Sequence, residues 1–409
     1  MSIADISDWI DDVSGPAWRW YVKRLAANDT LATNAHQAGP YVPREVLFEV
    51  LPELNRPEEY NPEVRFELKV DSHAEARTVR AIWYNGSLSG RSTRNEARVT
   101  GFGGRASALL DPDSTGAIVV FAFDAGAAGP TCRVWLCSNS LEEDVFEERL
   151  GPIEPKQHLF WAHGRPPVRL SRSVQPTSCW LGSSDIPQKW LESFPTGQEI
   201  VRKSLEKRPA KGVRPDKRLL QRRDCEFEIF RSVEQAFWMP RISEGFQSID
   251  VFVGTAQSIL QSRKARSGRS LEYHLGLIFE EEGMTAGRDF VHGPTIEGNK
   301  RPDFLFPSTL AYEDNEFPAA DLRMLAVKTT CRDRWRQILN EADRIEKKHL
   351  LTLQEGVSQN QLAEMTAAGV QLVVPQPLHA SYPEEARQNL LTVEAFIAER
   401  RRASMTGKS

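Results

Sequence analysis

The sequence predicts a multi-domain protein with a mainly β N-terminal half and an α/β C-terminal half. Its 409 residues are enough for two or three domains that each bury a core. Short β-branched and aromatic runs fill residues 41–150, whereas helical periodicity dominates from about residue 217. Seven of the 25 prolines lie in residues 151–200, which indicates a linker. We therefore expect domains at 1–171 and 186–409, joined by a linker at 172–185.

The N-terminal half alternates apolar runs with turns. The runs at 81–85, 117–123 and 132–137 have strand composition, and GFGG at 101–104 has turn chemistry. No Lys-Ser or Lys-Thr follows these glycines, which excludes a phosphate-binding P-loop. We expect one helix, at about residues 17–27, to open this mostly β domain.

The C-terminal half combines helical patterns with two short apolar runs. The runs DFLFP (303–307) and RMLAVKTT (323–330) predict strands inside a helical domain. A basic segment, 202–223, carries ten Lys/Arg and two acids, so it either follows a DNA backbone or forms a solvated face. The predicted helices are at about 217–238, 246–264, 270–282, 333–349 and 384–402.

Composition excludes several classes of protein. Charged residues make up 26% and hydrophobic residues 40%, which are values of a globular protein and not of a disordered one. The net charge of −4 excludes a histone-like protein that is basic throughout, although local basic clusters can still bind DNA. No apolar stretch approaches 18 residues, and the acidic start lacks signal-peptide features. We expect a soluble cytoplasmic protein without a membrane partner, whose five cysteines are buried reduced thiols.

The segment 297–349 carries the most informative chemistry. Asp303 opens one predicted strand and Lys328 lies towards the end of the next, so both are expected at one edge of the sheet. A carboxylate that binds a divalent cation, with a lysine that orients water, is suited to phosphodiester hydrolysis. Many nucleases place a second acid two residues before the lysine, but Ala326 occupies that position here. A solvated strand tip is the alternative interpretation of this lysine.

Glu341 is the candidate for the missing acid. It lies in the predicted helix at 333–349, at the edge of an apolar face, and is seven residues from Arg334, so both are expected on a similar side. An acid on the inward edge of a core helix needs a partner, which a metal ion would supply. A surface ion pair with Arg344 or Lys348 is the alternative. The expected buried face consists of Trp335, Ile338, Leu339, Ala342 and Ile345.

Arg332, Asp333 and Arg334 follow the candidate catalytic strand directly. Arginine binds guanine O6 and N7 in a bidentate manner, and an acid accepts from the cytosine amino group. The triplet therefore suits adjacent G·C pairs in the major groove. Its structural alternative is a helix start, where the negative charge of Asp333 is favoured by the helix dipole.

Several long blocks of the sequence resemble the EcoRII-type restriction endonucleases, over nearly the whole chain and with both domains in the same order. The similarity is weakest across 151–215. The blocks that carry it are KRLAANDT (23–30), HQAG (36–39), RNEAR (94–98), EGNKRPDFLFPS (297–308), MLAVKTTCRDRWRQILNEAD (324–343), LTLQEGVS (351–358) and GVQLVVP (369–375).

This resemblance implies an N-terminal β-pseudobarrel of the B3 type that binds effector DNA, and a C-terminal α/β restriction-endonuclease-like domain of the PD-(D/E)xK type. It implies a Mg²⁺-dependent homodimer that cuts both strands of DNA before CCWGG, where W is A or T. Such enzymes engage two or more DNA sites, and the N-terminal domain restrains the catalytic cleft until effector DNA binds. A cognate cytosine methyltransferase would protect the host DNA without having to bind this protein.

The resemblance also assigns residues. Asp303 and Lys328 match the family's catalytic pair, Glu341 the second acid, and Glu272 a further acid. In the catalytic domain the DNA-binding matches are Arg332, Asp333 and Arg334, with Arg223 and Phe227 where a flipped base is held. In the effector domain the DNA-binding matches are His36, Tyr41, Arg94, Glu96 and Arg98.

Other functions stay open at the level of sequence. A DNA-binding protein that does not cleave would have the same fold, although the intact Asp303, Lys328 and Glu341 argue against it. A nuclease for a related site such as CCNGG would share every motif, because specificity at the central pair depends on DNA shape and flipping energy. A repair nuclease would show no preference among intact duplexes.

Overall fold

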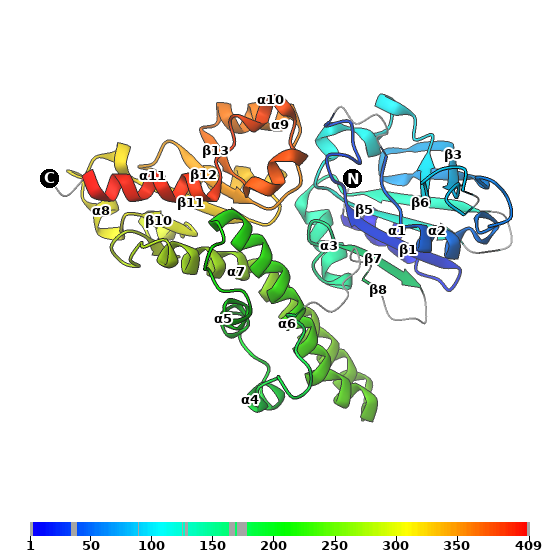
Figure 1. Ribbon diagram of the computed structural model, residues 1–409, viewed down its shortest axis with the longest axis horizontal. Coiled ribbons are helices and arrows are strands. Elements are labelled where there is room, and N and C mark those ends of the chain that lie inside the picture. The colour runs from blue at the N-terminus through cyan, green and yellow to red at the C-terminus, as the bar shows by residue number, and fades with distance from the viewer. Residues whose placement is uncertain are drawn as a thin grey trace.

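The structure is a computed structural model that describes residues 3–33, 39–88, 90–124, 126, 130–162, 168–169 and 178–406. It has an N-terminal β lobe and a C-terminal α/β lobe, from which a pair of long helices projects (Figure 1). The expected division into two structural halves is confirmed. Part of the expected linker, 172–177, lies outside the described residues.

The N-terminal lobe is built on an eight-stranded sheet with the order β4-β3-β2-β6-β5-β1-β7-β8. Among the described residues, the edge strands β4 and β8 do not pair with each other, so the sheet forms an incomplete barrel, and the pseudobarrel prediction is confirmed. The strands are β1 (Trp18–Arg24), β2 (Glu63–Val70), β3 (Glu75–Tyr84), β4 (Glu96–Thr100), β5 (Ile118–Asp124), β6 (Thr131–Leu136), β7 (His158–Ala162) and β8 (Val168–Arg169).

The helix expected at 17–27 is wrong, because Trp18–Arg24 is the central strand β1. It pairs antiparallel with β5 and with β7, and its aromatic residues fill both faces of the sheet. Tyr21 belongs to the core inside the curve, whereas Trp20 packs outside it under the helices. Tertiary pairing on two sides therefore determines the conformation of this segment. The helices of this lobe are α1 (Ile3–Asp12), α2 (Arg44–Val50) and α3 (Ser140–Leu150).

The C-terminal lobe has three layers, and the middle layer is a five-stranded sheet with the order β13-β12-β11-β10-β9. β9, β10 and β11 pair antiparallel, and β11, β12 and β13 pair parallel. One core cluster joins α6, α7 and α11 to one face of the sheet, and a second covers the opposite face. The strands are β9 (Val291–His292), β10 (Phe304–Phe306), β11 (Arg323–Lys328), β12 (Lys348–Thr352) and β13 (Val370–Val373).

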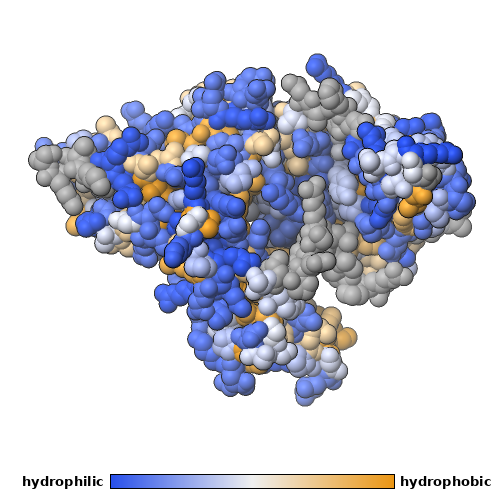
Figure 2. All heavy atoms as spheres, viewed as in Figure 1, coloured by the Kyte–Doolittle hydropathy of each residue, from blue (hydrophilic) through white to orange (hydrophobic). Residues whose placement is uncertain are grey.

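Two long helices, α6 (Pro215–Glu244) and α7 (Ile249–Glu281), form the projecting hairpin (Figure 1). The separate helices expected at 246–264 and 270–282 are wrong, because α7 continues through both. Gly268 lies inside α7 with open space where a Cβ would be, so it does not end the helix. Figure 2 shows apolar patches among hydrophilic ones on the projecting lobe. The exposed apolar residues at the hairpin tip are Met239, Ile242, Ile249, Val251, Phe252 and Val253.

The remaining helices position the catalytic sheet. The helix expected at 333–349 is wrong, because a 3₁₀-helix, η8 (Asp333–Asn340), ends before Glu341 and Lys348 begins β12. The expected helix at 384–402 is divided in two, α10 and α11. The helices not yet named are α4 (Gln188–Glu192), α5 (Gly197–Lys207), α8 (Thr309–Glu313), α9 (Gln359–Ala367), α10 (Glu384–Arg387) and α11 (Val393–Thr406).

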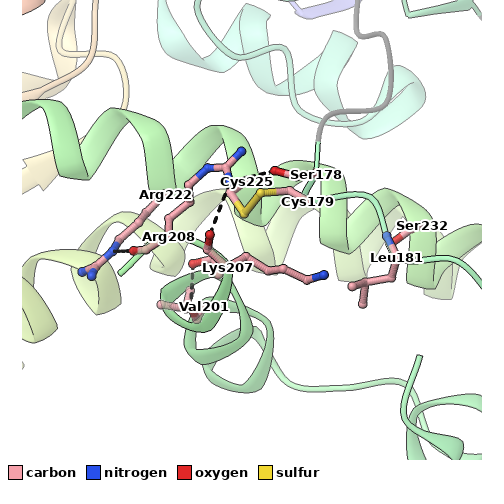
Figure 3. Close-up of a disulfide and its surroundings, with 10 residues drawn as sticks. Ser178, Cys179, Leu181, Val201, Lys207, Arg208, Arg222, Cys225 and Ser232 are labelled. Carbon is pink, nitrogen blue, oxygen red and sulfur yellow. Dashed lines mark hydrogen bonds between the residues drawn. A yellow bond between two sulfur atoms is a disulfide. The ribbon is translucent and has the colours of Figure 1, made fainter. Parts of the chain in front are cut away.

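The cysteines follow the expectation in part. Cys132, Cys137 and Cys331 are free and buried, as expected. The expectation is wrong for Cys179 and Cys225, which form a disulfide that closes a loop of 46 residues (Figure 3). Both cysteines are buried in the core cluster of α4, α5 and α6, so proximity in the fold pairs them although their sequence spacing carries no motif.

None of the helices in the described part of the chain is long and apolar enough to cross a membrane.

Candidate active site and domain interface

Asp303 and Lys328 meet at one edge of the five-stranded sheet, as their positions in the sequence predict. The antiparallel register pairs Phe304 with Leu325, so Asp303 lies beside the end of β11. The backbone N–H of Val327 donates to Asp303 Oδ2 at 2.7 Å, and Lys328 Nζ lies 3.4 Å from the same oxygen. The carboxylate therefore has one oxygen held by β11 and its lysine.

Glu341 reaches this site from a different element than expected. It follows η8, and its backbone is extended (φ −92°, ψ 142°). Burial and, to a smaller extent, the negative charge of Asp303 raise its pKa to about 7, against the opposing charges of Lys328 and Lys348. Its buried Oε2 has no hydrogen-bond partner among the described residues. A buried carboxylate without a donor requires a proton or a cation.

A third carboxylate approaches from α7. Burial raises the pKa of Asp303, and the nearby charge of Glu272 adds to the increase, while Lys328 and the Val327 N–H lower it. Glu272 accepts a hydrogen bond from His292 Nε2 at 2.8 Å. Glu272, Asp303 and Glu341 thus lie around one lysine, with more negative than positive charge.

This donor set fits a hard divalent cation, for which oxygen ligands are preferred. The unpartnered oxygen of Glu341 and the raised pKa of both Asp303 and Glu341 are what a cation would relieve. Within the described ranges, no three potential ligands are already at coordination distances.

The predicted base-reading triplet is covered by α3 of the N-terminal lobe. Arg332 is buried and donates to Glu143 at 2.8 Å and to the backbone oxygens of Cys137 and Ser138, each at 3.1 Å. Asp333 accepts from the backbone N–H and hydroxyl of Ser140, at 3.3 and 3.0 Å. Arg334 lies 3.5 Å from Asp144. All three side chains face protein in this conformation.

A second ionic cluster joins the lobes at Arg223. This arginine is buried and donates to Glu154 of the N-terminal lobe at 3.1 Å and to Glu226 at 2.8 Å. Arg266 also donates to Glu154, at 2.6 Å. Burial opposes ionisation of Glu154, but Arg266 and Arg223 outweigh it and lower its pKa to about 2. Phe227 lies beside this cluster, with the Arg266 guanidinium 5.2 Å from its ring centre.

A cavity of about 750 Å³ lies between the lobes. Tyr41, Glu96 and Arg98 line it from the N-terminal side, and Arg223 and Phe227 from the C-terminal side. The predicted effector and base-holding residues therefore share one cavity.

The remaining effector residues are only partly placed. Arg94 is exposed, and its guanidinium lies 5.6 Å from the ring centre of Tyr84. His36 lies outside the described residues.

Sequence reasoning missed Glu143, Glu154 and His292. Each is an ordinary charged or polar residue in its own segment, without a spacing signal. Glu143 and Glu154 contact arginines that are 189 and 69 residues away in sequence. His292 is 20 residues from Glu272. Only the fold brings these partners together.

Known proteins resemble both halves of the chain. The family model "Restriction endonuclease EcoRII, N-terminal" matches residues 14–165, and "EcoRII C terminal" matches residues 230–397. The chain is 42% identical over 403 residues to the type II restriction enzyme EcoRII of Escherichia coli, covering 98% of each. It is 28% identical over 150 residues to the type II restriction enzyme SsoII of Shigella sonnei, covering 35% of this chain and 47% of that protein.

Two solved structures show weaker similarity. Metal-depleted Ecl18kI in complex with uncleaved, modified DNA has a TM-score of 0.44 at 20% identity and covers 54% of this chain and 83% of that one. The UbaLAI B3 domain with cognate DNA has a TM-score of 0.27 at 20% identity and covers 40% and 99%. The two family matches and the near full-length identity establish that the chain belongs to the EcoRII family of type II restriction enzymes, which are site-specific deoxyribonucleases.

Proposed function

We propose that this enzyme makes Mg²⁺-dependent double-strand cuts before CCWGG and is activated through its N-terminal domain by a second DNA site. The observation that carries the proposal is the meeting of Asp303, Lys328 and Glu341 at one sheet edge, beside a base-reading triplet that the N-terminal lobe covers. We also propose the division into an effector domain at 1–171, a linker at 172–185 and a catalytic domain at 186–409.

For catalysis we assign the metal to Asp303 and Glu341, with Glu272 as a further acid. When bound, Mg²⁺ would polarise the scissile phosphate and acidify a water. The Val327 N–H fixes one oxygen of Asp303 and leaves the other for a ligand role. Lys328, 3.4 Å from the fixed oxygen, is placed to orient the attacking water or to stabilise charge on the phosphate.

A homodimer follows from the number of active sites. One chain carries one Asp303–Lys328 pair, and a double-strand cut requires one hydrolysis on each strand. A two-fold symmetric pair of chains matches a recognition sequence that is nearly palindromic.

For specificity we assign the outer G·C pairs to the triplet 332–334. Bidentate arginine contacts with guanine discriminate by about 1–3 kcal/mol each. Arg223 and Phe227 would receive an extruded central base, since both line the interlobe cavity and an aromatic ring offers a stacking surface. If the enzyme recognised CCNGG instead, mapping of the cleaved ends would show cuts at sites with any of the four bases at the central position.

For regulation we infer autoinhibition by direct occupation. Glu143 and the two backbone oxygens satisfy the Arg332 guanidinium that would otherwise bind guanine. Glu154 occupies Arg223 in the same way. Effector DNA that binds Tyr41, Glu96 and Arg98 would enter the cavity between the lobes and weaken these contacts.

The test is cleavage of a plasmid with several CCWGG sites by the full-length protein in Mg²⁺, with the ends mapped by sequencing. We expect discrete ends before CCWGG, and slower cutting of a single-site plasmid that an added effector duplex restores. Ends at another sequence would overturn the specificity. Equal cutting of both plasmids would overturn the activation by a second site.

A substitution tests the metal assignment. Asp303→Asn keeps the size of the side chain but removes its charge, so we expect specific DNA binding to remain and cleavage to fall by at least about 10³-fold. Gel-shift and cleavage assays on the same duplex separate the two effects. Retained cutting would exclude Asp303 as a metal ligand.

A further inference from the structure

Among the described residues, the side chain of His292 hydrogen-bonds to Glu272 at the edge of the candidate active site. Its Nε2–H donates to Glu272 Oε2 at 2.8 Å, and the Glu272 side chain is only 18% exposed. Glu272 is on α7, whereas His292 is on β9, so the bond joins the helix to the sheet. The charge of Glu272 in turn acts on Asp303.

The imidazole ring is itself fixed on two sides. It stacks on Phe304, with ring centres 4.9 Å apart and 22° between the planes. Tyr273 contacts it edge-on, with centres 5.9 Å apart. The strand register pairs His292 with Phe304, the residue that follows Asp303. The backbone N–H of Gly293 also donates to the carbonyl of Asp303, at 2.9 Å. His292 is therefore tied to the backbone that carries the catalytic aspartate.

We propose that His292 is a positioning residue for the metal site: it holds the Glu272 carboxylate in register with Asp303. The proposal rests on the metal-dependent function proposed above. Glu272 is the further acid of that site, and residues that hydrogen-bond to the carboxylates of a metal site fix their orientation. Loss of such a residue typically costs about 10–100-fold in metal affinity or activity. Without His292, Glu272 would be free to change rotamer, because no other described side chain donates to it.

Two substitutions at this position separate the ring from the hydrogen bond. His292→Phe preserves both aromatic contacts and removes the donor, whereas His292→Gln removes the ring and places an amide N–H near the position of Nε2. We expect His292→Phe to weaken Mn²⁺ binding to the DNA complex by about tenfold or more, and His292→Gln to recover most of that affinity. Electron paramagnetic resonance measures free Mn²⁺ directly, so the readout does not depend on cleavage.

A double-mutant cycle tests whether His292 acts through Glu272. We expect His292→Phe to have no further effect on Mn²⁺ binding in a Glu272→Gln background. His73→Phe, on the exposed surface of the N-terminal lobe, is the matched control and should bind Mn²⁺ like the wild type. Thermal melting without metal checks folding, and His292→Asn, which is too short to reach Glu272, replaces the phenylalanine variant if that one unfolds.

The outcomes are distinct. Wild-type affinity in folded His292→Phe, or an equal loss in the Glu272→Gln background, would overturn the positioning role. Wild-type protein that neither bound Mn²⁺ nor cut DNA would overturn the proposed function as well. If His292→Phe weakens Mn²⁺ binding tenfold in the wild type but has no effect in the Glu272→Gln background, the positioning role is supported. This result does not depend on which DNA sequence the enzyme cuts.

Discussion

The environment of the candidate active site disfavours the ionised form of two of its carboxyl groups, Asp303 and Glu341. Burial raises the pKa of both Asp303 and Glu341, and the charge of Asp303 further raises that of Glu341, while Lys328 opposes both shifts. These raised pKa values favour the protonated carboxyls when no cation is present. The residues of the site are therefore arranged for exchange between protons and a metal ion.

This exchange predicts a pH-dependent metal requirement. The pKa of Glu341 is raised to about 7, so the carboxyl is mostly protonated below pH 7 and mostly ionised above it. Between pH 8 and pH 6 the ionised fraction falls about tenfold, and we expect the Mg²⁺ concentration for half-maximal single-turnover cleavage to rise by a similar factor. A requirement that is constant over this range would show that Glu341 is not a ligand.

At the scale of elements, α3 and η8 form the contact that covers the triplet 332–334, for which we propose a DNA-reading role. Glu143 on α3 accepts from Arg332 and also from Arg24 within its own lobe. Glu147, one turn later, pairs with Arg24 but not with the triplet. Substitutions at these two glutamates can therefore distinguish a general loss of α3 stability from loss of the contact with Arg332, which we propose is inhibitory.

We expect Glu143→Gln to raise cleavage of a single-site plasmid without effector DNA by roughly 30-fold or more, because loss of one partner of a buried charge pair costs about 2–5 kcal/mol at an interface. Glu147→Gln is the matched control and should leave the basal rate unchanged. Initial rates of linear product measure both. An equal rise in the two variants would indicate general loosening of the N-terminal lobe.

The disulfide between Cys179 and Cys225 links the segment proposed as the linker, 172–185, to α6. Figure 3 shows Arg208 beside it, donating to Ser178 at 2.8 Å and accepting from Arg222 at 2.9 Å through its backbone oxygen. Closing a loop of 46 residues restricts the unfolded chain by about 4 kcal/mol in the chain-entropy model.

We therefore expect Cys179→Ser to lower the urea midpoint of the catalytic domain under oxidising conditions. The same loss should appear when a reductant is added to the wild type, and the reductant should not affect the variant. Cys331→Ser, at a free buried cysteine, is the control for the loss of a thiol. A variant as stable as the oxidised wild type would contradict the prediction.

At the scale of the whole molecule, polar contacts between described residues join the two lobes at three places. These are the triplet under α3, the cluster around Glu154, and the segment after β12. In the last of these, Gln354 approaches Gly116 so closely that a Cβ there would lie 2.6 Å from its side chain, and Ser358 donates to Asp113. The hydrogen bonds and ion pairs at these three places give the interface a polar character, which suits an interface that opens.

We expect a fragment of residues 178–409 to fold and to cut single-site plasmids without effector DNA, since it retains its own three core clusters and loses the covering helix. Circular-dichroism melting establishes folding, and full-length protein with and without effector duplex provides the comparison. A folded fragment that is inactive on every plasmid would show that the N-terminal domain is needed for cleavage.

The sequence by itself placed the proposed catalytic pair at neighbouring strand ends, because strand ends are marked locally. Asp303 precedes one apolar run and Lys328 ends the next, and an antiparallel register brings such ends together. Periodicity likewise predicted α6 and the strands β5 and β6. It failed for β1, where pairing on both sides decided the conformation, and for the segment after Asn340, where β12 pairs with two neighbours.

Only the tertiary structure decided what the catalytic and reading residues contact. Glu341 was expected at the site, but on a helical face that does not exist, and its unpartnered oxygen is a property of the folded environment. Glu143 covers Arg332 from 189 residues away, and His292 holds Glu272 from a neighbouring strand. Local patterns report helix and strand periods, whereas contacts between distant segments depend on how the elements pack, which no local period encodes.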